Sequence, residues 1–290
     1  MNKVVKPFVK WVGGKTQLLK EIENLIPNDI TNSKFTYVEP FVGGGAVLFW
    51  VLQKYKNIDK VVINDINLDL INSYLTVKNN VNELILILKE WEYEYNMLNN
   101  RIDYYYDKRK LFNSRTLNSL YQSALFIFLN KTCFNGLYRV NKKNEFNVPM
   151  GSYKNPTICD VKNLRAVSDI LKDVIILNGD FEDTLKYAYN NTIFYLDPPY
   201  KPLTKTSSFT SYSKLNFNDD EQVRLSKFCK NINNQNSKFI LSNSDVKSID
   251  NNDFFDKLYS GFKFKKVLAK RSINSNPNKR GELTELLITN

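Results

Sequence analysis

The pattern of apolar and polar residues opens with a strand–loop–helix–strand unit. Residues 36–39 form a short apolar strand, the loop 40–45 contains three glycines, and the apolar run 46–55 has the length of a helix. A second apolar strand covers residues 60–64 and ends at Asp65. Strands that alternate with helices in this way predict an α/β fold built on a parallel, doubly wound sheet.

The middle of the chain breaks this alternation. Apolar residues recur at helical spacing across 68–130, and the segment 134–149 alternates around a Lys-Lys-Asn turn, which is typical of a β-hairpin. Strand-like runs then return at 173–177, 192–196, 238–242 and 285–289. We therefore predict a Rossmann-like sheet with helices on both faces, formed by residues 1–67 and 159–290. A mainly helical insert, residues 68–158, interrupts it and carries the hairpin.

Length and composition agree with a folded core. Of the 290 residues, 42% are hydrophobic and 13% are aromatic, which excludes a disordered or collagen-like chain. No apolar stretch approaches the ~20 residues that a membrane span needs. The first residues also lack the apolar core of a signal peptide. We therefore expect a cytoplasmic protein that has no membrane partner.

The chain is strongly basic. Its formal net charge of +11 favours a polyanionic partner, with nucleic acid ahead of an anionic membrane. The excess is concentrated in residues 1–20, 68–158 and 261–290. A single cluster of this kind is usually only a solvated face. Three clusters that flank the motifs described below favour contact with nucleic acid.

The lack of histidine and of paired cysteines limits the catalytic groups and metal ligands that the chain can use. The chain has no histidine, which excludes Ser-His-Asp hydrolases, Cys-His proteases and histidine-ligated metal sites. Its three cysteines, Cys133, Cys159 and Cys229, are too far apart in sequence to form a Cys-x-x-Cys pair. Any general acid, base or ligand must therefore come from Asp, Glu, Lys, Tyr, side-chain amides or the backbone. We expect no metal.

A glycine-rich turn follows the first predicted strand. The run Glu39-Pro-Phe-Val-Gly-Gly-Gly45 opens a helix, so backbone N–H groups can face a ligand there. Asp65 ends the next strand, where a carboxylate can accept hydrogen bonds from both ribose hydroxyls of a nucleoside. A plain tight turn and a helix-capping role for Asp65 are the alternatives. The spacing is not the Gly-x-Gly-x-x-Gly of dinucleotide enzymes, which disfavours a nicotinamide dehydrogenase.

A second motif, Asp197-Pro198-Pro199-Tyr200, follows the apolar strand 192–196. The two prolines fix the backbone and remove two N–H donors, which leaves carbonyls as unpaired acceptors beside a carboxylate. Together with an aromatic face, these acceptors suit a planar base that carries an exocyclic amino group. A rigid strand-to-loop turn is the plain alternative for a Pro-Pro pair. That alternative does not explain why the glycine run occurs in the same chain.

In combination, the motifs resemble those of S-adenosylmethionine-dependent DNA adenine-N6 methyltransferases of the Dam-like branch. That class has the order glycine motif, recognition insert, Asp-Pro-Pro-Tyr. The resemblance covers nearly the whole chain, and it is specific because several short motifs occur in the family's order. The matching stretches are residues 7–15, 39–45, 64–65, 134–139, 146–153, 197–200 and 209–212.

The resemblance implies a cofactor site. The cofactor would be S-adenosyl-L-methionine, which is converted to S-adenosyl-L-homocysteine. Asp65 would hold the ribose hydroxyls, and Asp180 with Phe181 would flank the cofactor adenine. Trp11, Gly13 and Lys15 would surround the methionine part of the cofactor. Phe41 and Gly43 would form the floor of the site, and Asp197 of the second motif would also contact the cofactor.

The resemblance also implies how DNA is held. The target adenine would lie against Asp197, Pro198, Pro199 and Tyr200. Arg139 suits a bidentate contact with guanine O6 and N7. Lys10 would contact the first guanine of GATC. The other implied DNA-binding residues are Phe134, Asn135, Leu137, Pro149 and Tyr153.

Each of these DNA-binding positions, taken singly, could also be a plain surface or hairpin residue. Cys133-Phe134 departs from the family's hairpin, so Phe134 and Asn135 are both candidates to fill the space that a flipped base leaves. Basic residues that are candidate phosphate contacts are Lys205, Lys214, Lys270, Arg271, Lys279 and Arg280.

We therefore expect methyl transfer to N6 of an adenine flipped out of duplex DNA, within GATC. Adenine N6 is a weak nucleophile because its lone pair is delocalised into the ring, so positioning is the main catalytic effect. The expected partner is double-stranded DNA, bound by a monomer from a bacterium or phage. A cognate restriction endonuclease, if one exists, would act independently.

Two alternatives stay open at this point. One is methylation of another planar amine, such as cytosine N4, an RNA base or a protein amide. The Asp of Asp-Pro-Pro-Tyr and the predicted hairpin favour adenine in DNA instead. The other is a catalytically dead DNA-binding relative, which would have lost Asp65, Asp197 or Tyr200. All three are present.

Overall fold

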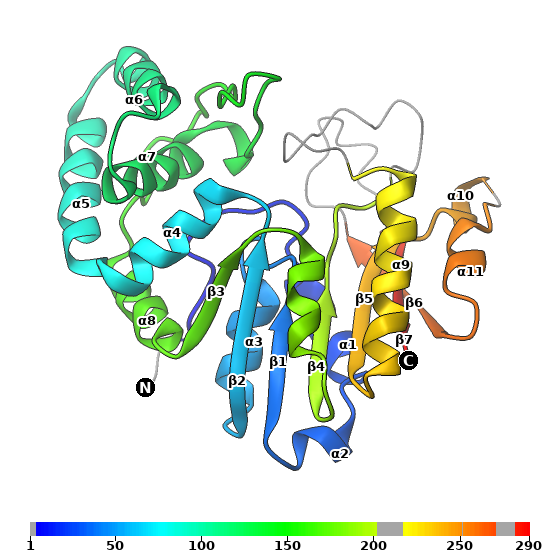
Figure 1. The fold of residues 1–290 in the computed structure, drawn as a ribbon. Helices are drawn as coiled ribbons and strands as arrows, with labels where there is room; N and C mark the ends of the chain where they lie inside the picture. Colours follow the sequence, from blue (N-terminus) through cyan, green and yellow to red (C-terminus); the bar gives the residue numbers. More distant parts are fainter. Residues whose placement is uncertain (1–3, 202–216, 251, 271–281) are drawn as a thin grey trace.

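The computed structural model describes residues 4–201, 217–250, 252–270 and 282–290 of the chain. Among these residues, seven strands form one sheet in the order β3-β2-β1-β4-β5-β7-β6 (Figure 1). The strands are β1 (Phe35–Glu39), β2 (Ile58–Asp65), β3 (Val174–Asn178), β4 (Thr192–Leu196), β5 (Lys238–Ser244), β6 (Lys263–Lys270) and β7 (Glu282–Thr289).

The five strands β1 to β5 pair in parallel, whereas β7 is antiparallel to both β5 and β6. The chain enters β7 at the edge of the sheet where β4 and β5 end, because Ser244 at the end of β5 pairs with Glu285. The predicted α/β fold with a Rossmann-like sheet is therefore confirmed. The antiparallel strand also brings residues near the C-terminus to the carboxyl edge of the parallel strands.

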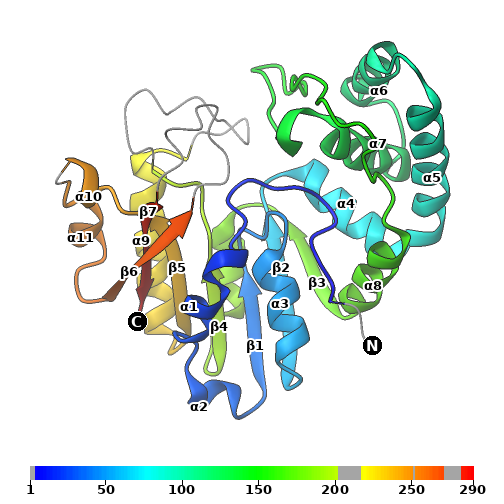
Figure 2. The ribbon, with the colours of Figure 1, turned by 180° about the vertical axis from the view of Figure 1, so that it is seen from behind.

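Helices cover both faces of the sheet. Figure 1 shows α9 in front of β4 and β5, and Figure 2 shows α1 and α3 on the opposite face. The α-helices are α1 (Leu19–Glu23), α2 (Asn28–Thr31), α3 (Ala46–Lys54), α4 (Leu68–Asn79), α5 (Val81–Met97), α6 (Ile102–Ser114), α7 (Ser119–Thr132), α8 (Val161–Leu171), α9 (Asp219–Asn234), α10 (Lys247–Asp250) and α11 (Phe254–Leu258). Short 3₁₀ helices are η1 (Thr16–Leu18), η2 (Phe134–Gly136) and η3 (Phe181–Tyr187).

The core has two parts because strand side chains alternate between the faces of the sheet. On β1, Tyr37 belongs to the cluster that contains Phe49 of α3, and the next residue, Val38, belongs to the cluster that contains Phe228 of α9. All of these side chains are buried. Strand β1 is therefore buried on both sides, at all of its positions.

The helices α4 to α7 leave the end of β2 and pack together at one side of the sheet (Figure 1). Their apolar residues, such as Leu88 and Phe128, belong to the same buried cluster as Tyr37 of β1. The predicted insert 68–158 thus shares one continuous core with the sheet. The domain boundaries at 67 and 159 stay a prediction.

The expected hairpin over 134–149 is present as a chain reversal, but the segment contains no regular strand. Its pairing is limited to two isolated bridges, Cys133 with Met150 and Val140 with Phe146. A side chain of α6 anchors one arm of this reversal. Asn113 accepts a hydrogen bond from the Phe146 N–H (2.8 Å) and donates one to the Phe146 carbonyl (3.0 Å). The bonds of the inner bridge come from the neighbouring residues, because Asn141 N–H donates to the Glu145 carbonyl and Asn147 N–H donates to the Arg139 carbonyl. Phe146 therefore bonds to α6 on the side that faces away from Val140.

Strand β6 is not visible in the sequence pattern. Lysines at 263, 265 and 266 interrupt its apolar residues. The strand lies at one end of the sheet order, and lysines on an edge strand discourage pairing with another chain. The pattern therefore reflects an exposed edge rather than a loop. Within the described residues, no helix has both the length and the apolar character needed to cross a bilayer.

Gly45 joins the glycine-rich turn to α3, where only glycine fits. Its φ is +75°, a region that L side chains rarely adopt. A Cβ at this position would lie 2.5 Å from the hydroxyl of Tyr74, which itself donates to the Gly43 carbonyl (3.0 Å). The turn is therefore fixed both by its own backbone and by α4.

We predict that Gly45→Ala lowers the free energy of unfolding by about 2 kcal/mol or more, because strained φ and steric overlap add. Urea denaturation measures the change. Gly261→Ala is the matched control, since Gly261 has φ +93° but nothing within 4 Å of its Cβ position. Equal losses in the two variants would show that the contact with Tyr74 has no energetic consequence.

Candidate active site and nucleic-acid interface

The two predicted motifs meet at the carboxyl edge of the parallel strands. The glycine-rich turn follows β1, Asp65 ends β2 and Asp197 follows β4, and β1 pairs with both β2 and β4. The N–H of Gly43 donates to Asp65 Oδ2 at 3.0 Å, which links the turn to the second strand. This edge, where the strand order changes direction, is where open α/β sheets bind ligands.

Asp65 is not a helix cap. Asn67 caps α4, because its side chain accepts the Leu70 N–H, and Asp65 Oδ1 accepts the Asn67 N–H at 2.9 Å. Burial raises the pKa of Asp65 to about 6, and the hydrogen bonds from Asn67 and Gly43 oppose that rise. A partly buried carboxylate held by two backbone N–H groups keeps further lone pairs for hydroxyl donors.

Lys15 pairs with the carboxylate of the second motif. Its ammonium lies 2.9 Å from Asp197 Oδ1, donates to the Gly13 carbonyl at 2.6 Å, and lies 4.7 Å from the centre of the Tyr200 ring. Lys15 is only 5% exposed. Burial raises the pKa of Asp197, and the Lys15 ammonium opposes that rise. The sequence assigned Lys15 to the cofactor and did not predict this ion pair.

The backbone after Asp197 differs in part from expectation. We expected unpaired carbonyls, but the Pro199 carbonyl accepts a hydrogen bond from Gln222 Nε2 at 3.2 Å. The hydroxyl of Tyr200 donates to Glu285 Oε2 at 2.8 Å. Burial, together with the carboxylates of Asp197 and Glu285, raises the pKa of Tyr200 well above its usual range, so the phenol stays a donor.

Trp11 packs directly on the glycine-rich turn. A Cβ at Gly43 would lie 2.8 Å from Trp11 Cδ1, and one at Gly44 would lie 2.8 Å from Trp11 Cβ. On its other side, the indole stacks on Tyr138 (ring centres 5.7 Å apart) and lies against Phe126. The small residues at 43 and 44 are thus required by the packing of Trp11, in addition to any ligand.

Phe41 and Phe181 lie together beside this turn, with ring centres 5.3 Å apart. Phe41 is partly exposed and Phe181 is buried. Asp180 accepts the Glu182 N–H at 2.9 Å and forms an ion pair with Arg224, whose guanidinium lies over the Phe181 ring. The sequence grouped Asp180 with Phe181 but did not indicate Arg224, which comes from α9.

Glu39, the acidic residue of the first motif, is deeply buried. Its Oε2 accepts a hydrogen bond from the Tyr37 hydroxyl (2.9 Å), and the residue is 2% exposed. Burial raises the pKa of Glu39 well above its usual range, and the nearby carboxylates of Asp197 and Asp65 add to that rise. The buried site therefore favours the protonated form of Glu39, and that form reduces repulsion among three neighbouring acids.

The predicted DNA-binding residues Lys10 and Tyr153 lie together. The Lys10 ammonium is 3.9 Å from the centre of the Tyr153 ring. Asn130 fixes the backbone of Lys10 through two hydrogen bonds and also donates to the Gly136 carbonyl at 3.1 Å. Burial lowers the pKa of the adjacent Lys131 to about 8, and Lys10 adds to the effect. The N-terminal segment is therefore attached to the predicted recognition segment.

The other predicted readers lie in that recognition segment. Phe134 is 50% exposed, and Asn135 has φ +54°, which turns the backbone of η2. Arg139 is exposed and donates from Nε to Asn147 Oδ1 at 2.7 Å, so one edge of its guanidinium is fixed. Leu137 is partly buried and Pro149 is exposed. No reasoning from sequence indicated Asn147 as the support of Arg139.

Most of the candidate phosphate contacts cannot be placed. Lys205, Lys214, Arg271, Lys279 and Arg280, and the matching stretch 209–212, lie outside the described residues. Lys270 is the last residue of β6, and its side chain is also outside the described part.

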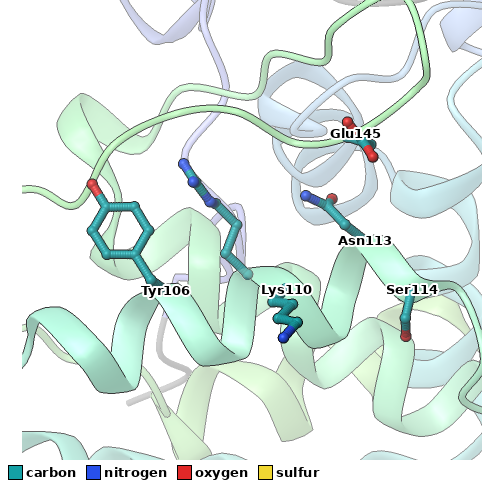
Figure 3. Close-up of a pocket in the computed structure, with 6 residues that line it drawn as sticks. Tyr106, Lys110, Asn113, Ser114 and Glu145 are labelled. Atoms are coloured by element: carbon teal, nitrogen blue, oxygen red, sulfur yellow. The ribbon is translucent and has the colours of Figure 1, made fainter.

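A separate hollow of about 430 Å³ lies between α6 and the chain reversal (Figure 3). Tyr106, Lys110 and Asn113 line it from α6, and Glu145 lines it from the chain reversal. Most of its lining residues are polar or charged and it contains neither motif, so it is not the candidate active site. Among the described residues, no group of three or more Cys, Asp or Glu side chains is placed to hold a metal ion.

Some of the residues near the site that were not predicted do carry a signal in the sequence. The polar run Ser242-Asn243-Ser244 follows an apolar strand, the same signal that indicated Asp65 and Asp197. Glu285 carries no such signal, because it lies near the start of its strand and reaches the site only through antiparallel pairing.

Comparison with known proteins identifies the family. A family model described as D12 class N6 adenine-specific DNA methyltransferase matches residues 11–273. The chain is 53% identical to the Type II methyltransferase M.MjaIII of Methanocaldococcus jannaschii, and the match covers 99% of each chain. It is 38% identical to a DNA adenine methylase of Haemophilus influenzae, over 97% of this chain and 92% of the other. It is also 37% identical to the Type II methyltransferase M1.LlaDCHI of Lactococcus lactis subsp. cremoris, over 100% and 97%. The carboxyl-edge motifs described above are thus those of an enzyme, and the chain belongs to the D12 class of N6 adenine-specific DNA methyltransferases.

Proposed function

We propose that this enzyme transfers the methyl group of S-adenosyl-L-methionine to N6 of a flipped adenine in duplex DNA, within GATC. S-adenosyl-L-homocysteine is the second product. The observation that carries the proposal is that Asp197, paired with Lys15, lies at the same sheet edge as Asp65. One carboxylate suits ribose hydroxyls and the other suits an exocyclic amine, so donor and acceptor would meet between them.

The side chains at this edge fit a cationic methyl donor. When bound, S-adenosyl-L-methionine supplies a methyl group on a positively charged sulfur. The carboxylates of Asp65 and Asp197 lie here, and the charge of Lys15 is already paired. The partly exposed ring of Phe41 adds an aromatic face that favours a nearby cation. The other residues assigned to this site are Trp11, Gly13, Gly43, Asp180 and Phe181.

The chain's own groups position the acceptor amine. Asp197 and the Pro198 carbonyl each accept a hydrogen bond from one N–H of adenine N6. Pro199 keeps the backbone rigid, and Tyr200 stacks on the base. N6 then forms a bond to the methyl carbon as the carbon–sulfur bond breaks. The amine finally loses one proton, to Asp197 or to water. The raised pKa of Asp197 makes it a better acceptor for that proton.

The target base must leave the duplex because N6 is buried in the base stack. Phe134, half exposed on η2, and its neighbour Asn135 are placed on an exposed turn from which either could fill the vacated space. Arg139 would read a guanine, and Leu137 with Pro149 would contact a thymine methyl. Lys10, stacked on Tyr153, would read the first guanine of GATC.

The same proposal covers organisation and partners. Residues 1–67 and 159–290 would form the catalytic domain and 68–158 the DNA-recognition insert. The net charge of +11 supports duplex DNA as the partner. We propose that the enzyme acts as a monomer. Two of the similar proteins are called Type II methyltransferases. We propose that any cognate restriction endonuclease acts independently of this chain, which would work in a bacterial or phage-infected cytoplasm.

Transfer of labelled methyl groups to duplex oligonucleotides tests the proposal. We expect label on adenine in GATC and none in duplexes with any one of the four bases changed. Asp197→Ala should abolish transfer while the variant still binds the cofactor, since Asp65 is untouched. Label in a different sequence would reject GATC as the target sequence. Retained turnover by Asp197→Ala would reject the role of the Asp197 carboxylate in positioning adenine N6.

Arg139→Ala should relax discrimination at one base pair of the site by about 1–3 kcal/mol, because a bidentate contact with guanine is lost. The measurement is kcat/KM for GATC and for each single-base variant. Lys143→Ala, an exposed residue of the same chain reversal, is the matched control. An unchanged base preference in Arg139→Ala would assign the guanine contact to another residue.

Cofactor affinity should fall as the pH drops through about 6. Ribose hydroxyls donate more strongly to Asp65 when it is ionised, because protonation converts one acceptor oxygen into a donor, and the pKa of Asp65 is about 6. Binding therefore favours the charged form, and affinity should decrease by up to about tenfold per pH unit below that pKa. Calorimetry of wild type and Asp65→Asn measures this. The variant should bind weakly with little pH dependence, and a flat profile for the wild type would contradict the assignment.

A further inference from the structure

Tyr200 is held at three points by residues that the motifs do not include. Its hydroxyl donates to Glu285 at 2.8 Å. The carbonyl that precedes it, that of Pro199, accepts from Gln222 at 3.2 Å. The N–H that follows it, that of Lys201, donates to Asn243 Oδ1 at 3.4 Å. A side chain fixed at both its backbone and its tip cannot change rotamer without breaking one of these bonds.

Two of these residues form a buried amide relay. Gln222 of α9 and Asn243 of β5 are both 0% exposed, and Asn243 Nδ2 donates to Gln222 Oε1 at 3.0 Å. The hydroxyl of Ser244 also donates to the Lys201 carbonyl at 2.8 Å. Because each of these amides both donates and accepts, the relay connects α9, the end of β5 and the backbone on both sides of Tyr200.

Glu285 comes from the antiparallel strand. It pairs in register with Ser244, so β7 delivers a carboxylate beside the loop that follows β4. Glu285 is also close enough to Asp197 to raise that residue's pKa. On the other side, the Lys15 ammonium lies 4.7 Å from the centre of the Tyr200 ring and pairs with Asp197. Glu285 and Lys15 thus restrict the ring from its tip and from its face.

We propose that Glu285 is a positioning residue for Tyr200, and that the Gln222–Asn243 relay fixes the backbone on which Tyr200 stands. The inference rests on the proposed function, in which Tyr200 stacks on the flipped adenine. A ring held at its hydroxyl keeps one plane, so the stacked base presents N6 to Asp197. Reaction rates are sensitive to such alignment, and a misplacement of about 1 Å can reduce them by roughly 100-fold.

Four variants test the role of Glu285: Glu285→Leu, Glu285→Gln, Tyr200→Phe, and the double variant Glu285→Leu/Tyr200→Phe. We expect Glu285→Leu to slow single-turnover methyl transfer by roughly 10–100-fold with cofactor affinity unchanged. Glu285→Gln keeps an acceptor for the Tyr200 hydroxyl and should retain most of the rate. The double variant should be no slower than the slower single variant, because both changes remove the same hydrogen bond.

Fluorescence reads the stacking directly. With 2-aminopurine in place of the target adenine, a base that leaves the duplex and stacks on Tyr200 is quenched, whereas an unstacked flipped base is bright. Glu285→Leu should therefore raise the emission of the complex above that of wild type. Gln222→Met, which removes the donor to the Pro199 carbonyl, should raise it as well. Glu90→Leu, which removes an exposed acid of α5, should leave the emission unchanged.

The outcomes separate this inference from the proposed function. Independent, multiplicative rate losses for Glu285→Leu and Tyr200→Phe would overturn the inference, as would unchanged fluorescence in Glu285→Leu. Thermal unfolding of each variant identifies losses of rate that come from misfolding. If Glu285→Leu is misfolded, the rate of Glu285→Gln becomes the test. If wild type itself transfers no methyl group to adenine in duplex DNA, the proposed function fails and the inference fails with it.

Discussion

The site depends on the burial of one cation. The Lys15 ammonium is withdrawn from water and compensated by Asp197, the Gly13 carbonyl and the face of Tyr200. An unpaired charge in such a position would cost several kcal/mol, so the N-terminal segment and the loop after β4 must stay in register. The same pairing keeps Asp197 closer to ionised than its burial alone would allow. The ion pair of Lys15 with Asp197 therefore contributes both to the structure and to the chemistry of this edge.

The short segment 10–15 extends this constraint to the rest of the molecule. Trp11 fills the space above the glycine-rich turn and stacks on Tyr138 of the predicted insert. Lys10 is fixed by Asn130 of α7 and lies over Tyr153. Six consecutive residues thus contact the sheet edge, the glycine turn and the recognition segment. Parts of the chain that would read DNA and parts that would carry out transfer are attached to the same piece of backbone.

Local patterns predicted most strands and the main motifs because their signals are contained within a few residues. Apolar runs predicted β1, β4 and β5, and each motif carboxylate follows such a run. Where side chains from elsewhere take over a backbone group, the predictions fail. Gln222 takes the Pro199 carbonyl that we expected to be unpaired, and Asn113 holds the backbone of Phe146 against α6. Both side chains lie on helices distant in sequence, where no local pattern can reveal them.

The sequence by itself determined the α/β fold, the order of the motifs and the types of chemical group available, since these follow from periodicity and composition. Tertiary structure alone decided which groups meet. Lys15 reaches Asp197 across 182 positions of chain, and Glu285 reaches Tyr200 because β7 runs antiparallel between β5 and β6. The physical reason is that burial and hydrogen bonding act between groups that are close in space, and strand order and direction set that closeness.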